Sequence, residues 1–386
     1  MTTAVNDRID AFELPAVDST PATHFITDKD LQKSSNNLNA VRLILATAVI
    51  YSHSYYPLHD TDALKPLLGW PISWFAVDGF FVLSGFLVYR SLERRDSILD
   101  YAASRVSRIW PGLMVMAIVV GLMGMFFSRL STTAYMADPK FLEFVLGAAT
   151  LRPHYELPGV QCGTALCNVN GSLWTIPWEC YCYCILGILF TAAKYLGGRR
   201  AVVAALVASF ALALLTDIPA VHGALAAKIG SKIYFVDQFS RLWAAFALGI
   251  ALYIFRSRVP LNWIAAIGVL IAACLLQNTG FAGHARTIAA AYFVLCAGFR
   301  SGNFSANWGD YSFGMYIYAM PVLAMFITLG VHLPPIMLTL AVAAVTAPLA
   351  FASWHLVEKP ALDMKSQLQR WHKARAARQE VDGIPA

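Results

Sequence analysis

Long apolar runs separated by short polar patches make up most of this chain. A run of about 17–25 mostly apolar residues is long enough to cross a bilayer as a helix. The pattern therefore predicts an all-α polytopic membrane protein with about ten transmembrane helices. The predicted spans are residues 38–56, 74–90, 109–127, 172–193, 201–216, 236–255, 261–277, 286–300, 309–330 and 335–356. One more apolar piece, residues 141–150, is too short to cross and is expected to be re-entrant or to lie at the surface.

The composition agrees with a membrane protein and excludes other classes. Hydrophobic residues make up 58% of the 386 residues and charged residues only 13%, whereas soluble domains carry about 25% charged residues. Such a chain could not cover a soluble surface, and it is neither disordered nor fibrous. Despite the net charge of +6, we expect no nucleic-acid partner; the expected surroundings are membrane lipid.

The distribution of Lys and Arg predicts the orientation, because cytoplasmic connections are enriched in these residues. If the N-terminus is cytoplasmic, the inside connections hold more than twice as many Lys and Arg as the outside ones. Both termini are therefore expected in the cytoplasm, and the positive charge is explained by topology. The predicted parts are a flexible cytoplasmic tail (residues 1–36), a membrane domain (37–358) with an outside loop near 128–171, and a basic cytoplasmic tail (359–386). Residues 1–36 lack the features of a cleavable signal peptide.

Two cysteines, Cys162 and Cys167, fall in the predicted outside loop. An oxidising compartment would permit a disulfide between them. Zinc is the competing interpretation, but no second pair of ligands stands at metal spacing, so the disulfide is favoured and no metal is expected.

Polar residues inside the first span form the first candidate site. Arg42 and His53 are eleven residues apart, so on a helix they share a face and lie about 16 Å apart along the axis. An ionisable side chain within a span is costly and is a candidate for function. The alternatives without a functional role are that Arg42 is a cation that reaches the membrane interface and that His53 is a hydrogen-bonded structural residue.

Two carboxylates are predicted near the depth of His53. Asp78 lies about one turn into the second span, and Glu179 about seven residues into the fourth. Because a carboxylate next to an imidazole orients and charges a general base, the three residues form a candidate catalytic group. Alternatively, Asp78 pairs with a helix N-terminus, and Glu179 pairs with an arginine. Ser84, in the second span, is a polar contact or, more simply, a packing residue.

The predicted inside connection before the third span is rich in arginine, and Arg105 and Arg108 are three residues apart, on one helix face. Guanidinium groups are preferred phosphate binders. Topology explains the same cluster equally well, and both interpretations stay open.

Six motifs in order resemble the acyltransferase-3 family of integral membrane O-acyltransferases, and together they cover about residues 38–361. They are Arg42 with His53, Asp78 to Phe86, Arg105 and Arg108 with Ile109-Trp110-Pro111, Asn170 to Trp174 running on to Glu179, Gly309 to Tyr316, and Ser353 to Pro360. The resemblance is to the stand-alone form, without a fused extracytoplasmic domain. Many members carry a histidine late in the Gly309–Tyr316 block, but here Ala319 follows Tyr318, so that histidine is not required in this chain.

The resemblance implies a ten-helix bundle in the bacterial inner membrane. It would transfer an acyl group, usually acetyl from acetyl-CoA, to a hydroxyl of a cell-surface or exported polysaccharide or a lipid-linked sugar. Arg42, Arg105 and Arg108 would bind acetyl-CoA, and His53 would act as the base or carry the acetyl group, oriented by Glu179 or Asp78. Support on the acceptor side would come from Ser84, Asn170, Ser172, Trp174, Trp178 and Tyr316.

A proton-coupled transporter of a glycolipid or polysaccharide intermediate is the alternative, since buried acids and histidine also serve proton relays. Transporters more often show repeated halves with broken helices, which this sequence lacks. A membrane scaffold would leave the buried acids unexplained.

Overall fold

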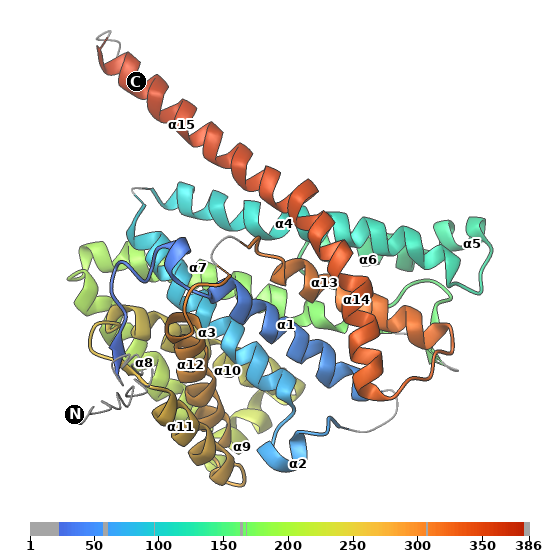
Figure 1. The fold of residues 1–386 in the computed structure, drawn as a ribbon, viewed down its shortest axis with the longest axis horizontal. Helices are drawn as coiled ribbons and strands as arrows, with labels where there is room; N and C mark the ends of the chain where they lie inside the picture. The colour runs from blue at the N-terminus through green and yellow to red at the C-terminus, as the bar shows by residue number, and fades with distance from the viewer. Residues whose placement is uncertain are drawn as a thin grey trace, which may run out of the picture.

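The chain is seen in a computed structural model that describes residues 23–56, 61–95, 97–162, 165–166, 168–305 and 308–381. Apart from two short strand pairs, the regular secondary structure of the described residues is helical (Figure 1). The helices are α1 (Leu38–Tyr55), α2 (Lys65–Leu68), α3 (Ile72–Glu93), α4 (Ile98–Met123), α5 (Thr132–Ala137), α6 (Pro139–Ala149), α7 (Thr175–Tyr195), α8 (Arg199–Thr216), α9 (Pro219–Ile229), α10 (Ile233–Ile254), α11 (Trp263–Leu275), α12 (Ala282–Arg300), α13 (Ser312–Thr328), α14 (Pro335–Ser353) and α15 (Lys359–Val381). The strands are β1 (His24–Phe25), β2 (Gln161–Cys162), β3 (Ala165–Leu166) and β4 (Pro260–Leu261), with β1 pairing antiparallel to β4 and β2 to β3.

Each predicted span overlaps one helix between α1 and α14, although α4 begins at Ile98, well before the predicted start at residue 109. Among the described residues, six helical segments are both long and apolar enough to cross a membrane, and α11 and α13 are shorter apolar helices. The helices α1 and α12 are outside both groups because polar residues lower their hydropathy; these include Arg42, His53 and Arg286. The all-α membrane fold is therefore supported, while the number of crossings and the sides of the termini stay predictions.

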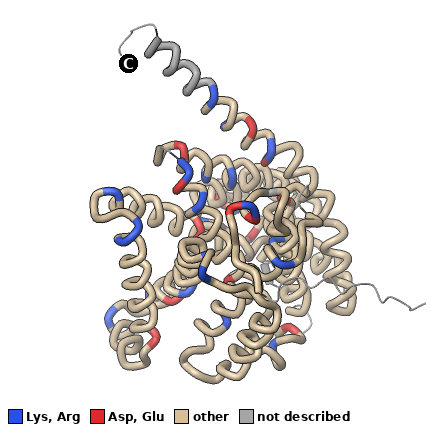
Figure 2. The backbone as a smooth tube through the Cα atoms, turned by 60° about the vertical axis from the view of Figure 1, so that its left-hand side comes forward, with Lys and Arg blue, Asp and Glu red and all other residues tan. Residues whose placement is uncertain are grey.

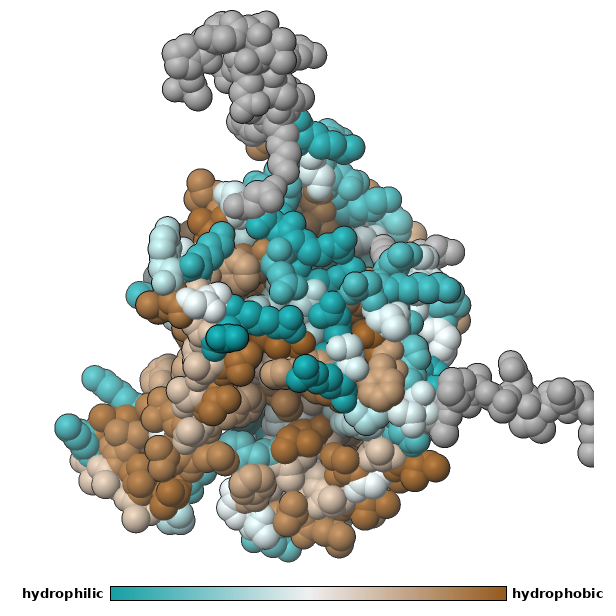
Figure 3. Space-filling view, turned by 90° about the vertical axis from the view of Figure 1, so that its left-hand side faces the viewer, coloured by the Kyte–Doolittle hydropathy of each residue, from teal (hydrophilic) through white to brown (hydrophobic). Residues whose placement is uncertain are grey.

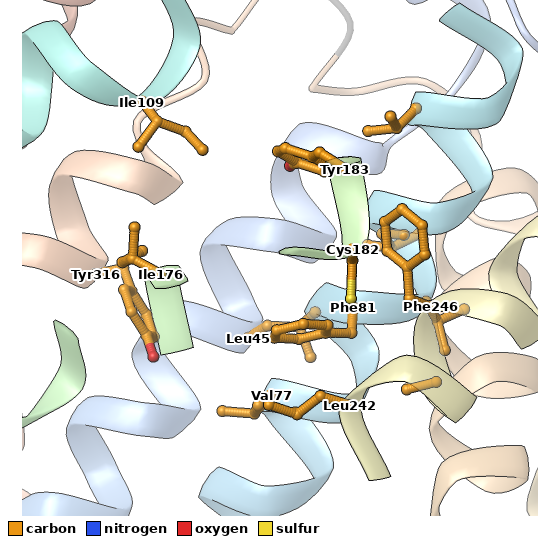
Figure 4. Packing of buried hydrophobic residues seen from close by; sticks show 14 of the residues in the cluster. Leu45, Val77, Phe81, Ile109, Ile176, Cys182, Tyr183, Leu242, Phe246 and Tyr316 are labelled. Atoms are coloured by element: carbon orange, nitrogen blue, oxygen red, sulfur yellow. The ribbon is translucent and has the colours of Figure 1, made fainter. Parts of the chain in front are cut away.

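The helix α3 lies at the centre of the bundle, packed against α1, α10 and α12 (Figure 1). Figure 4 shows apolar side chains from α1, α3 and α10 gathered at this crossing, among them Leu45, Phe81 and Phe246. At Gly85 of α3 and Gly249 of α10, an added Cβ would collide with the backbone of the other helix. Small residues thus allow the two backbones to touch, as in other membrane helix pairs.

We expect Gly85→Val to destabilise the protein by at least about 1–3 kcal/mol, since overpacking forces the backbone to shift. The measurement is the thermal unfolding midpoint of the protein in detergent. Gly268→Val in α11 is the matched control, because nothing lies within 4 Å of a Cβ there. Equal midpoints for the two variants would contradict this account of the α3–α10 contact.

The packed structure begins before residue 37. Residues 23–36, part of the segment predicted to be a flexible tail, lie along the bundle: β1 pairs with β4, and Ile26 and Leu31 are buried. The polarity of this segment predicts a flexible tail. Two buried apolar side chains and one strand pair nevertheless attach residues 23–36 to the bundle.

Two further predicted segments have more structure than expected. The predicted outside loop contains α5 and α6, and Phe144 of α6 is buried where α6 packs against α4. The predicted basic tail continues from α14 through a π-helical turn (Trp354–Glu358) into α15, which projects from the bundle (Figure 1). Charged residues gather around the end of the bundle from which α15 projects, and others lie at the opposite end (Figure 2).

Candidate active site

A cavity of about 950 Å³ opens between α1, α3, α4, α7 and the segment before α13. Figure 3 shows hydrophilic residues over the half of one face nearest to α15 and hydrophobic residues over most of the other half. Arginines outnumber carboxylates on the cavity wall, so the cavity is suited to an anionic ligand. The charged residues that line it are Arg42, Arg90, Arg94, Arg95, Arg105, Arg108, Asp100, Glu179 and Asp310.

An ion-pair network joins four elements at this cavity. Asp310 accepts from Arg42 of α1 and, at 2.7 Å, from Arg108 of α4. Arg108 also pairs with Glu358 at 3.0 Å, and Ser312 donates to Asp310 at 2.6 Å. Asp310 and Glu358 were not predicted as site residues. Both lie in motifs noted in the sequence, but only the fold brings these motifs against α1 and α4.

Arg105 and Arg108 differ in how their guanidinium groups are used. Arg108 forms ion pairs with the carboxylates of Asp310 and Glu358. Its guanidinium also lies over the rings of Phe313 and Trp354. Within the described part of the chain, Arg105 has no ion pair; it donates to Ser104 at 3.3 Å, lies over the Tyr183 ring, and has a buried Nε without a partner. Of these two arginines, Arg105 is therefore the one with free donors for a phosphate.

Glu179 of α7 lies on the wall of the cavity. Its Oε1 accepts from Ser84 at 2.8 Å and from Tyr183. Glu179 and Arg42 also line a smaller pocket of about 50 Å³, together with Phe80 and Tyr316. The two spaces therefore meet at Glu179, and Ser84 is a polar contact of this carboxylate and not a packing residue.

Asp78 is fully buried and is paired with arginine. Its Oδ2 accepts from Arg286 at 2.9 Å and from Thr287 at 3.0 Å, both of α12. Arg241 of α10 lies 3.7 Å from Oδ1. Neither alternative given for Asp78, a histidine partner or a helix N-terminus, matches these contacts. The arginines that hold it are far away in the sequence, so the pairing had no local signal.

His53 does not share these contacts. Its ring lies 5.4 Å from that of Tyr56, and within the described residues it has no hydrogen bond or ion pair. It also does not line the cavity or the smaller pocket. The predicted convergence of Asp78, Glu179 and His53 is thus not what the structure shows, because each carboxylate is held by other partners.

Asn170, Ser172 and Tyr316 are brought together where the residues before α7 meet α13. Asn170 donates to the Ile317 carbonyl at 2.9 Å, and Ser172 donates to Asn170 Oδ1 at 2.8 Å. Because Pro321, four residues later, lacks an N–H, the Ile317 carbonyl has lost its helical partner. Asn170 replaces that partner, so this group supports the kinked helix.

The two predicted tryptophans face different surroundings. Trp174 lies under the Arg241 guanidinium, 5.9 Å from its centre, whereas Trp178 packs against Phe235 and Phe239 of α10.

Cys167 lies outside the described residues, and so does the side chain of Cys162, which leaves the disulfide a prediction. In the described part of the chain, no cluster of His, Cys, Asp and Glu could hold a metal ion.

Comparison with known proteins gives the family. The model of the acyltransferase domain matches residues 35–355. The chain belongs to this acyltransferase family. It is 28% identical to an O-acetyl transferase of Shigella phage Sf6 over 351 residues, which are 86% of this chain and 97% of that protein. It is 26% identical to nodulation protein 10 of Rhizobium leguminosarum bv. viciae over 353 residues, 86% of this chain and 95% of that protein.

No solved structure shows significant similarity to the chain. The family match confirms the resemblance found in the sequence, since it covers five of the six motifs and the beginning of the sixth. Family membership and the similarity to an O-acetyl transferase together support an O-acyltransferase of the membrane.

Proposed function

We propose that this acyltransferase moves an acetyl group from acetyl-CoA to a hydroxyl of a cell-surface or exported polysaccharide or of a lipid-linked sugar. The observation that carries the proposal is the arginine-lined cavity beside the family's first-span motif. Acetyl-CoA carries several phosphates, and a cavity with an excess of guanidinium groups suits such a donor. In the proposed orientation, the cavity opens to the cytoplasm of a bacterial cell, where acetyl-CoA is made.

On the donor side, Arg105 meets a CoA phosphate directly, since its donors are not used by a carboxylate. Arg108 acts as a positioning residue: it fixes Asp310, which in turn holds Arg42 at the mouth of the smaller pocket. The acetyl end of the donor then points past Glu179 into the bundle. No metal is needed for this arrangement.

In the transfer step, the acceptor oxygen attacks the thioester carbonyl carbon, the C–S bond breaks, and the CoA thiolate leaves. His53 takes the proton from the attacking hydroxyl and returns it to the thiolate. In the two-step version, a ring nitrogen of His53 first takes the acetyl group and then passes it to the hydroxyl. In both versions, the thioester must travel along α1 from Arg42 towards His53, about 16 Å away.

Glu179 is proposed to guide the thioester where the two spaces meet, on its way towards His53. We expect Glu179→Gln to reduce acetyl transfer by more than about tenfold, the size of effect typical of lost charge-assisted contacts. CoA affinity should change by only a few-fold, because the arginines are untouched. Transfer and CoA affinity are measured in the same detergent. Tyr183→Phe is the control that removes one hydrogen bond and keeps the charge, and normal transfer by Glu179→Gln would contradict this role.

The test of the proposed function is transfer of radiolabelled acetyl from acetyl-CoA in membranes with and without the chain. Label should appear in the saccharide fraction only when the chain is present. Label that stays with CoA in both membranes would contradict the proposal. The transporter alternative gains no specific support, because Asp78, a fully buried acid, is paired with Arg286.

A further inference from the structure

A second cluster of arginines lies away from the cavity, where α3, α10, α12 and the turn before α7 meet. We name it the Arg241 site and define it by Trp74, Asp78, Trp174, Arg241 and Arg286. It contains two guanidinium groups and one carboxylate. Arg286 and Thr287 both donate to Asp78 Oδ2 at about 3 Å, as a direct pair should, but Arg241 stays 3.7 Å from Oδ1.

Among the described residues, Arg241 forms no hydrogen bond, and its contact with Asp78 is a long one of 3.7 Å. Its Nε and Nη2 are buried and unpaired, and so is Asp78 Oδ1. A guanidinium removed from water without a partner is costly, so such groups are normally satisfied. Arg286 and Thr287 use only Oδ2 of Asp78, so two guanidinium groups share one carboxylate, which leaves the site with one positive charge and free donors.

Aromatic rings frame the free guanidinium. The centre of Arg241 lies 5.4 Å from the Trp74 ring and 5.9 Å from the Trp174 ring. The Arg241 side chain is 19% exposed and Trp74 is 46% exposed, whereas Arg286 and Asp78 are closed off. The site is therefore open at Arg241 and Trp74. An arginine fork binds planar oxyanions in a bidentate manner, and flanking aromatic faces with few polar groups are typical of ligand sites.

We propose that the Arg241 site binds an oxyanion carried by the acceptor, with a sugar ring of the acceptor against Trp74. The oxyanion is either the phosphate of a lipid-linked sugar or the carboxylate of an acidic sugar. This inference rests on the proposed function, because it names the acceptor of that reaction. Asp78 lies six residues before Ser84 on α3, about 9 Å along the helix, and Ser84 contacts Glu179, so a sugar held here lies within reach of Glu179.

The test is equilibrium binding of radiolabelled probes to the full-length chain in detergent. The charged probes are a polyprenyl phosphate and glucuronic acid, and the matched neutral probes are polyprenol and glucose. The wild-type chain should bind at least one charged probe more tightly than its neutral counterpart. Preference for polyprenyl phosphate identifies a lipid carrier, and preference for glucuronic acid identifies an acidic sugar; both support the site.

Arg241→Gln should weaken binding of the charged probe by at least about tenfold, as for loss of a charge-assisted hydrogen bond. Its fold should survive, since the Asp78 contacts with Arg286 and Thr287 remain. Arg241→Lys keeps the charge but loses the forked donor geometry, so its affinity for the charged probe should lie between those of the wild type and Arg241→Gln. It replaces Arg241→Gln as the test variant if that variant does not fold. Arg258→Gln, on an exposed arginine beyond the other end of α10, is the matched control and should bind as the wild type does.

Equal binding of charged and neutral probes by the wild type would overturn the proposal. So would unchanged binding by Arg241→Gln, or an equal loss in Arg258→Gln. A chain that binds the probe through Arg241 but transfers no acetyl group would contradict the proposed function and leave the anion site standing.

Discussion

His53→Ala is expected to abolish acetyl transfer while the protein remains folded and abundant in the membrane. Loss of a general base lowers the rate by about 10²–10⁴-fold, and loss of an acyl-carrying residue would stop the two-step route altogether. The structure makes this a clean experiment. Among the described residues, the ring of His53 contacts Tyr56 but has no hydrogen bond or ion pair to lose.

The measurement is acetyl transfer, with the protein amount and CoA affinity determined in the same preparation. CoA affinity should stay within a few-fold, since His53 is not part of the cavity wall. His284→Ala is a control for loss of a histidine elsewhere, because His284 pairs with the half-exposed Asp217. If His53→Ala retained more than a small fraction of transfer, neither version of the step through His53 would stand.

The second large effect is expected for substitutions of Arg105 and Arg108. The two substitutions should differ in their effect on stability. Arg108→Gln removes one partner from each of two buried or nearly buried carboxylates, Asp310 and Glu358. Breaking a buried pair in this way costs about 3–5 kcal/mol. We therefore expect a markedly lower unfolding midpoint together with loss of CoA binding and transfer.

Arg105→Gln should leave the unfolding midpoint nearly unchanged, because Arg105 makes no ion pair within the described residues. Its CoA affinity should nevertheless fall by about tenfold or more, the loss expected for a charge-assisted contact to phosphate. The measurements are thermal unfolding and CoA affinity for both variants. Equal loss of stability in the two variants would contradict the division of roles, and unchanged CoA affinity in Arg105→Gln would return this residue to a topological role.

The fold could be predicted from the sequence to the extent that it depends on local pattern. Apolar runs of membrane length correspond to helices because backbone groups in an apolar medium must pair within the segment. The grouping of Arg42, Arg105 and Arg108 at one cavity could also be anticipated. All three were placed near the same end of their spans by the positions of Lys and Arg.

Partners across the bundle could not be predicted. The sequence indicated that Asp78, Glu179 and His53 lie within spans, and depth alone suggested that they meet. Depth does not fix which way a helix faces. The packing of α3 against α12 turns Asp78 towards Arg286, and the packing of α3 against α7 places Ser84 beside Glu179.

By itself, the sequence determined the class, the family and the residues that carry charge into the apolar interior. These follow from composition, hydrophobic period and motif order, which are properties of the chain alone. Only the tertiary structure decided which charge meets which: Arg108 is bound by Asp310 and Glu358, while Arg241 has no hydrogen bond from any described residue. The physical reason is that ion pairs form between residues up to 268 positions apart, and their contact depends on how helices rotate and cross, which no local pattern records.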